Sequence, residues 1–123
     1  MKGNGNPFLV KPFPSVCLFL RGATMILHEL LIPVKSNSGK TFSRKVNREF
    51  SDYVVSLAGG LSELPLISGQ WKDHGKIYRE SMRPIRVACN KRTIQSIARK
   101  AREQFKQLSI MSYTVSNDVT FTV

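Results

Sequence analysis

A small group of acid–base side chains gathers around one turn of the sequence, Asp73-His74-Gly75. Asp73, His74 and Glu80 are of the types that give and take protons in many enzymes. Each also has a structural explanation, because Asp is common in turns, a histidine at a turn tip is solvated, and Glu80 stands among basic neighbours. The structural explanation is favoured, and Asp73 and Glu80 are kept as the catalytic candidates of an alternative function, a small enzyme with an acid–base cluster at the hairpin.

A second pattern, Ser38-Gly39-Lys40-Thr41, resembles part of a phosphate-binding loop between a strand and a helix. A complete loop has a further glycine five residues before Gly39, where this sequence has Val34. The sequence also lacks a convincing apolar strand ending in an aspartate that would hold magnesium. Nucleotide hydrolysis is therefore not expected, whereas weaker anion binding at the start of the following helix stays open.

Metal binding and nucleophilic catalysis find little support in the spacing of His and Cys. His28 and His74 lie far apart, and neither Cys17 nor Cys89 belongs to a paired metal-ligand motif. No nucleophile elbow of the G-x-S-x-G type occurs. We expect no metal site and no cofactor, and we expect Cys89 to be a small buried side chain.

Positive charge is the strongest compositional signal, with 19 Lys and Arg against 8 Asp and Glu. Residues 1–24 hold three basic residues and no acid, so the remaining 16 basic residues and all eight acids give the rest of the chain a charge of +8. Such a field favours anionic partners, nucleic acid first, although charge also serves solubility. The predicted anion- or nucleic-acid-binding residues are Lys40, Arg44, Arg48, Arg79, Arg83, Arg92 and Arg99.

The elements that position these residues follow from hydrophobic periodicity. Alternating apolar residues predict a strand over Ile26–Val34, and an apolar stripe at helical spacing predicts a helix over Phe42–Ala58, which ends at Gly59-Gly60. Strands are predicted over Leu64–Lys72 and Lys76–Cys89, joined as a hairpin, with Pro84 marking a bulge or an edge position.

A second helix and further strands are predicted in the rest of the chain. Asn90 is a good N-cap for a helix that runs to about Lys106, and strands are predicted over Ser109–Val115 and Val119–Val123. The order βαββαβ, with one possible extra strand, predicts an α+β ferredoxin-like sandwich, an antiparallel sheet with two helices on one face.

Several predicted strands also carry apolar residues on the face that two helices would leave bare. These residues are Leu27, Leu31, Ile67, Trp71, Met111, Tyr113 and Val115. A second apolar face indicates a partner, and we expect a homodimer through the open sheet. The chain is thus interpreted as a binding or assembly module for an anionic or protein partner, more than as an enzyme.

Residues 1–24 differ in composition from the rest and are interpreted as an extension or flexible arm before a single domain at residues 25–123. The apolar stretch Val16–Leu20 is too short to cross a bilayer and is preceded by prolines, which does not fit a secretory signal. Two cysteines are too few to form the several disulfides that usually stabilise a small secreted protein. We therefore expect a cytoplasmic protein that is not embedded in a membrane.

From Phe50 onward the chain resembles a family of small uncharacterised bacterial α+β proteins, many of which look exported, often as lipoproteins. The matching motifs are Gly60-Leu61-Ser62, Gly69-Gln70-Trp71, Asp73 with Gly75, Glu80-Ser81, and Phe105 with Gln107. The resemblance implies the α+β sandwich and no assigned activity, and the chain lacks the lipobox of exported members. If the family has a common site, Trp71, Asp73, Glu80 and Gln107 are implied as its candidates. The alternative is that they fix the hairpin and dock the second helix.

Overall fold

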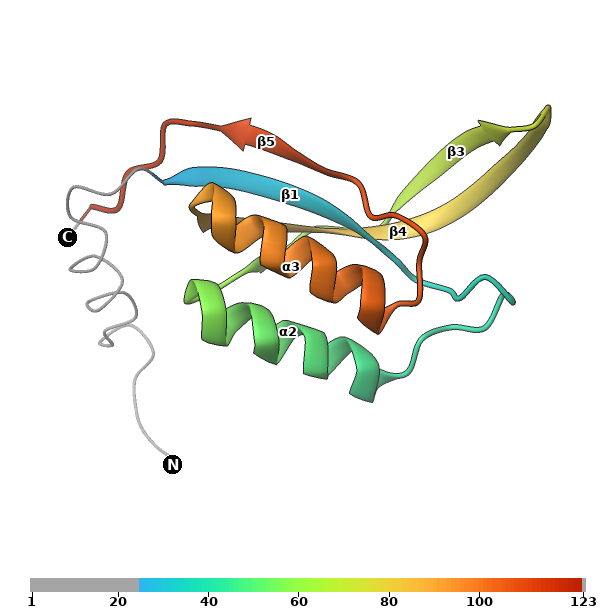
Figure 1. Ribbon diagram of the computed structural model, residues 1–123, viewed down its shortest axis with the longest axis horizontal. Helices are drawn as coiled ribbons and strands as arrows, with labels where there is room; N and C mark the ends of the chain where they lie inside the picture. The colour runs from blue at the N-terminus through green and yellow to red at the C-terminus, as the bar shows by residue number, and fades with distance from the viewer. Residues whose placement is uncertain (1–24, 123) are drawn as a thin grey trace.

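The computed structural model describes residues 25–122, which form one antiparallel sheet covered on one face by two helices (Figure 1). The elements are β1 (Ile26–Pro33), α2 (Arg44–Ala58), β2 (Ser62–Glu63), β3 (Ile67–Asp73), β4 (Lys76–Cys89), α3 (Lys91–Gln104) and β5 (Ser112–Ser116). The predicted α+β ferredoxin-like fold is confirmed. The predicted extension, residues 1–24, lies outside the described residues.

The strand order in the sheet is β2-β4-β1-β5, and β3 pairs with the first half of β4. β4 is long enough to pair with both β1 and β3, so the β3–β4 hairpin extends beyond the two helices (Figure 1). The predicted bounds of β4 are confirmed. Residues 119–122 are not a strand, so the prediction of a last strand over Val119–Val123 is wrong within the described residues.

The strand predicted over Leu64–Lys72 is divided into β2 and β3. Pro65 lies in the break, where it cannot donate a ladder hydrogen bond. Pro84 pairs with Leu31 without a shift of register, although a bulge or an edge position was predicted there. The irregularity lies in the segment that joins β2 to β3, on the other side of β4 from β1. Glu63 pairs with Ile85 and Ile67 pairs with Met82, so three residues of that segment face two residues of β4.

Helix bounds follow the capping side chains. The Ser43 hydroxyl accepts a hydrogen bond from the backbone N–H of Val46, so α2 begins at Arg44 and not at the predicted Phe42. Gly59 ends α2 at φ 90°, in the left-handed region that glycine adopts readily. Asn90 caps α3 as predicted, by accepting a hydrogen bond from the Thr93 N–H.

The core lies between the helices and the sheet face that carries Leu30, Ile32 and Val87. Phe105, just after α3, is fully buried there, with its ring edge-to-face against Phe42 at 5.0 Å and against Phe50 at 5.4 Å. Successive strand residues alternate between faces, so the neighbours of these core residues point to the opposite side of the sheet. We call that side the open face.

The open face is apolar but only partly covered. Leu31 and Met82 are buried, whereas other large apolar side chains on it are exposed, namely Ile67, Trp71, Tyr78, Met111, Tyr113 and Val115. None of the helices formed by residues 25–122 is long and apolar enough to cross a bilayer.

Candidate functional site: a pocket at the base of the hairpin

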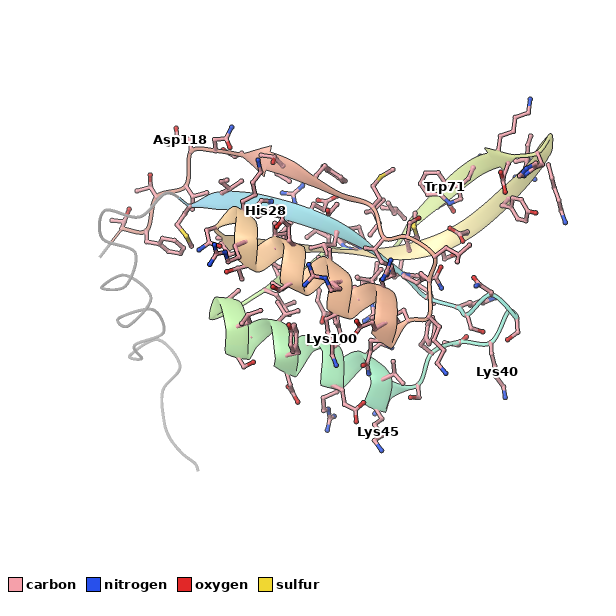
Figure 2. All side chains as sticks on the ribbon, viewed as in Figure 1. His28, Lys40, Lys45, Trp71, Lys100 and Asp118 are labelled. Atoms are coloured by element: carbon pink, nitrogen blue, oxygen red, sulfur yellow. The ribbon has the colours of Figure 1, made fainter. Side chains whose placement is uncertain are left out.

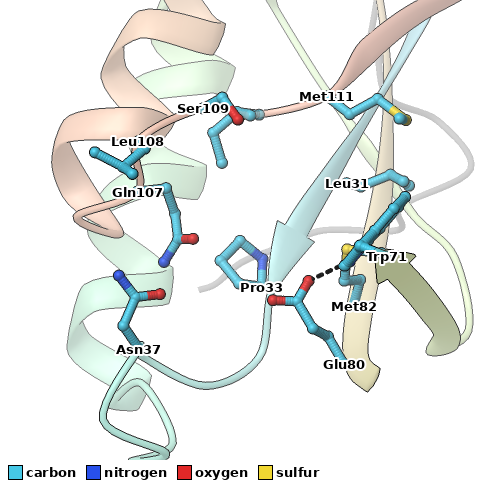
Figure 3. Close-up of a pocket in the computed structure, with 11 residues that line it drawn as sticks. Leu31, Pro33, Asn37, Trp71, Glu80, Met82, Gln107, Leu108, Ser109 and Met111 are labelled. Carbon is cyan, nitrogen blue, oxygen red and sulfur yellow. Dashed lines mark hydrogen bonds between the residues drawn. The ribbon is translucent and has the colours of Figure 1, made fainter. Parts of the chain in front are cut away.

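The β3–β4 hairpin diverges from β1 (Figure 1). A pocket on the open face lies at this point (Figure 3). The pocket has a volume of about 290 Å³. Its lining comes from β1, from the hairpin, from the loop between β1 and α2, and from the loop between α3 and β5. The lining residues are Leu31, Pro33, Asn37, Trp71, Glu80, Met82, Gln107, Leu108, Ser109, Ile110 and Met111.

Trp71 and Glu80 form the polar contact of the hairpin wall. The indole Nε1–H of Trp71 donates a hydrogen bond of 2.6 Å to Oε2 of Glu80 (Figure 3). Glu80 pairs in register with Gly69, two residues before Trp71 on the same face of β3. A Cβ at position 69 would lie 2.9 Å from Cζ2 of Trp71, so the indole occupies the space that Gly69 leaves above the strand.

The facing wall comes from the two loops. The Gln107 side chain donates a hydrogen bond of 2.9 Å to the Phe105 carbonyl through Nε2. The Asn37 and Gln107 amides point toward one another on the side of the pocket away from Trp71 (Figure 3). The pocket therefore has a carboxylate and an indole at one side, two amides at the other, and apolar side chains between them.

The acid–base cluster predicted around the turn is not assembled. In the β3–β4 ladder, Asp73 pairs with Lys76, whereas Glu80 pairs with Gly69. Asp73 and Glu80 are therefore four residue pairs apart, about 13 Å at the usual rise of a strand. Asp73 contacts Nδ1 of His74 at 2.9 Å at the hairpin tip, where both side chains are largely exposed. Glu80 lies at the pocket with Trp71 and Gln107, whereas Asp73, the fourth residue of the implied family site, lies outside it.

The loop that resembles a phosphate-binding loop is closed by its own hydrogen bonds. The Ser36 N–H donates to the Lys40 carbonyl at 2.7 Å, the Gly39 N–H donates to the Ser36 carbonyl at 2.9 Å, and the Lys40 N–H donates to Oγ of Ser36 at 3.2 Å. These N–H groups are therefore not available to cradle a phosphate. The helix also begins later, at Arg44, so Lys40 is not at a helix start.

The predicted anion-binding residues are spread over the molecule. Arg44 and Arg48 lie in the first turns of α2, and Arg92 lies at the start of α3, which runs antiparallel to α2 beside it (Figure 1). The N-termini of the two helices are therefore about 20 Å apart. The remaining predicted residues are Arg79 and Arg83 on β4, Lys40 on a loop and Arg99 in the second half of α3. Figure 2 shows Lys40, Lys45 and Lys100 on different parts of the surface.

A buried ionic network at the centre of the open face was missed by the sequence analysis. Glu29 is only 6% exposed, and its carboxylate accepts hydrogen bonds from Nε of Arg86 at 2.7 Å and from the Tyr113 hydroxyl. Burial raises the pKa of Glu29, but the hydrogen bonds from Tyr113 and Arg86 and the charge of Arg86 together hold that pKa below its usual value. The hydrogen bond to Glu29, with burial, raises the pKa of Tyr113.

Two further reactive groups are buried on the helix side of the sheet. His28 has no hydrogen-bond partner for Nε2 within the described residues. Burial lowers the pKa of His28, although a hydrogen bond with the Cys89 backbone opposes the shift. Burial raises the pKa of the Cys89 thiol to about 11. In residues 25–122, no group of three or more His, Cys, Asp or Glu side chains could hold a metal ion.

Comparison with known proteins identifies similar folds at low sequence identity. No family model and no curated protein matches the chain. Among solved structures, the divalent cation tolerance protein CutA1 of Thermus thermophilus is 11% identical, with a TM-score of 0.56 over 77% of this chain and 87% of that one. CutA1 of Oryza sativa is 9% identical, with a TM-score of 0.60 over 80% of this chain and 84% of that one.

A phage SAM lyase in complex with S-methyl-5'-thioadenosine is also similar, at 14% identity, with a TM-score of 0.59 over 76% of this chain and 82% of that one. These likenesses establish the shared fold. They confirm the small α+β sandwich implied by the family resemblance. The similar structures are of named proteins, whereas the family that the sequence resembles is uncharacterised. No family model supports membership of that family.

Proposed function

We propose that the protein is a binding module that self-associates through its hairpin and open face. The observation that carries the proposal is the projecting β3–β4 hairpin, which exposes apolar side chains on both of its faces. Trp71 and Tyr78 lie on the open face and Ile77 on the other, where it is 53% exposed. A two-stranded ribbon is marginally stable in water by itself, and exposed apolar patches of this kind mark interaction surfaces.

The edge of the hairpin supports the same proposal. Within the described residues, β3 pairs with β4 alone, so its outer edge presents unpaired backbone groups. Such an edge can accept a further strand, and a second copy of the chain supplies one with the same apolar pattern. A homodimer is the simplest closed arrangement of this kind.

Sedimentation velocity across a wide range of protein concentration tests self-association. The wild-type chain is expected to sediment as more than one copy, and the variant Ile77→Lys is expected to shift toward the monomer. Val55→Lys is the matched control, because Val55 is exposed to a similar extent, 47%, but lies on α2 away from the hairpin. A wild-type monomer at every concentration would contradict the proposal, as would equal effects of the two substitutions.

In addition to self-association, we expect the protein to bind an anionic partner. Among the 16 basic residues in residues 25–122, Arg86 alone forms an ion pair with a carboxylate of that region. Fluorescence anisotropy of labelled single-stranded RNA and duplex DNA at low and physiological salt tests the expectation. Binding that falls steeply with salt supports it, and binding that is absent at low salt would show that the charge serves solubility.

A second candidate function is a small enzyme in which Glu80 acts as an acid or base in the pocket. Glu80 lines the pocket, and the phage SAM lyase shows that a similar fold occurs in a protein that holds a thioadenosine. Incubation with S-adenosylmethionine, followed by chromatography for S-methyl-5'-thioadenosine, tests this candidate. Activity that Glu80→Gln abolishes without unfolding the protein would favour the enzyme, and the absence of product would favour binding alone.

A further inference from the structure

The pocket at the base of the hairpin differs in charge from the surface around it. The chain carries a net charge of +11, yet the one charged side chain among the described lining residues is that of Glu80. Its Oε2 accepts the indole N–H of Trp71, and its Oε1 has no hydrogen-bond partner within residues 25–122. A single carboxylate without an ion-pair partner, in a pocket of mixed polar and apolar lining, attracts a positively charged group.

Trp71 adds a second feature that favours a cation. The indole is held by its packing over Gly69 and by its hydrogen bond to Glu80, so its orientation is fixed before a ligand arrives. The side chain is still 36% exposed and lines the pocket. Tryptophan is the aromatic side chain with the strongest attraction for cations, and the attraction grows when the cation is partly desolvated.

The remaining lining limits the size and shape of a ligand. A volume of about 290 Å³ holds about ten non-hydrogen atoms, at the roughly 30 Å³ that a water molecule takes in the liquid. Leu31, Met82 and Met111 provide apolar contact, and they cannot replace the water shell of a small metal ion or of a primary ammonium group. The Asn37 and Gln107 amides offer hydrogen bonds to a hydroxyl or amide at the other end of a ligand (Figure 3).

We propose that this pocket binds a small organic cation, with a quaternary ammonium type of group seated against the wall that the Trp71 indole and the Glu80 carboxylate form together. An alkylated cation suits both the Glu80 carboxylate and the apolar side chains of the pocket, because it carries a full charge and presents an apolar surface. The proposal goes beyond self-association, since the described lining residues all come from one copy. Trp71 also belongs to the open face proposed for self-association, so a second copy seated there would compete with the ligand.

Fluorescence titration of the full chain tests the proposal directly, because Trp71 is the single tryptophan of the sequence. The ligands are choline and 3,3-dimethyl-1-butanol, which have the same shape but differ in charge. Choline is expected to change the Trp71 emission saturably and to bind at least about tenfold more tightly than the neutral alcohol, a difference of about 1.4 kcal/mol. Equal affinities, or no saturable change with choline or tetramethylammonium, would overturn the proposal.

Two matched variants locate the binding. Glu80→Gln keeps an oxygen that can accept the indole N–H but removes the charge, so it is expected to weaken choline binding about tenfold and to leave the alcohol unchanged. Glu63→Gln removes an exposed acid of β2 that does not line the pocket, and it is expected to change neither affinity. An equal loss of choline binding in both variants would contradict the assignment to this pocket.

Titration of Ile77→Lys separates the two proposals. Ile77 does not line the pocket, so this variant is expected to bind choline at least as tightly as the wild type when it sediments as a monomer. Loss of choline binding in that variant would contradict a site formed within one copy, whatever the result for self-association.

Discussion

The indole of Trp71 packs over the backbone of Gly69, so closely that a Cβ at position 69 would lie 2.9 Å from Cζ2 of the ring. Glu80, the cross-strand partner of Gly69, then receives the indole N–H at 2.6 Å. The absence of a side chain at position 69 thus lets an aromatic ring and a carboxylate meet across the hairpin. This arrangement fixes one wall of the pocket before any ligand binds.

Substitution Gly69→Ala should displace the Trp71 ring. The added Cβ would meet Met82 Cε at 2.7 Å, which a flexible side chain can relieve, but it would also meet the rigid indole. We expect the free energy of unfolding to fall by about 1 to 2 kcal/mol and the Trp71 emission to change as the hydrogen bond to Glu80 is lost. Urea unfolding and fluorescence spectra measure the two effects.

Gly60→Ala is the control for this substitution, because a Cβ at position 60 would meet nothing within 4 Å. It is expected to leave the emission unchanged and the stability within about 0.5 kcal/mol of the wild type. Similar losses in the two variants would mean that the close packing of Trp71 over Gly69 is not what stabilises the hairpin.

The Glu29 network should behave as one unit. Tyr113→Phe removes one donor and is expected to cost about 1 kcal/mol. Glu29→Gln leaves Arg86 without its carboxylate, and we expect a loss of about 2 kcal/mol, because water can reach the 39% exposed Arg86 side chain. The double variant should lose less than the sum of both, as measured by urea unfolding.

Glu103→Gln provides the reference for that series, since Glu103 is an exposed acid of α3. It is expected to change the free energy of unfolding by less than about 0.5 kcal/mol. Strict additivity of the Glu29 and Tyr113 effects would show that the two side chains stabilise the sheet independently.

His28 should make stability fall on mild acidification. Its pKa is lowered in the folded protein, so between that value and the unfolded value of 6.5 the unfolded chain binds more protons than the folded one. The free energy of unfolding is therefore expected to decrease as the pH falls below about 6.5, which urea unfolding at about pH 7.5 and about pH 5.5 can measure. His28→Gln should reduce this decrease, whereas His74→Gln, at the exposed hairpin tip, should leave it unchanged.

Most elements could be predicted from local patterns. The bounds of β4 and the Asn90 cap depend on alternation and on one side chain, and both were predicted correctly. The errors occurred where a single residue inside a predicted element breaks it or sets where it begins. Pro65 divides one predicted strand into β2 and β3, and Ser43 caps α2 two residues after the predicted start.

The candidate site was only partly predictable, because its residues are distant in the sequence. Of the four residues that the family resemblance grouped, Trp71, Glu80 and Gln107 line one pocket. The strand register carries the fourth, Asp73, to the hairpin tip. The sequence analysis did not single out Glu29, although it is buried in the structure. Its partners Arg86 and Tyr113 lie 57 and 84 residues away, so only the assembled sheet reveals why a carboxylate is tolerated there.

Cys89 should report on opening of the core. The thiolate is the reactive form of a thiol, and burial raises the Cys89 pKa to about 11 from its usual value of 9.0. At about pH 8 the folded protein then holds about one hundredfold less thiolate than an exposed cysteine, and the side chain is also shielded from reagent. In the variant Cys17→Ser, alkylation by iodoacetamide is expected to be slow in the native protein and at least about a hundredfold faster in urea. Rapid alkylation of the native variant would show that the sheet opens readily beside α3, where Cys89 ends β4.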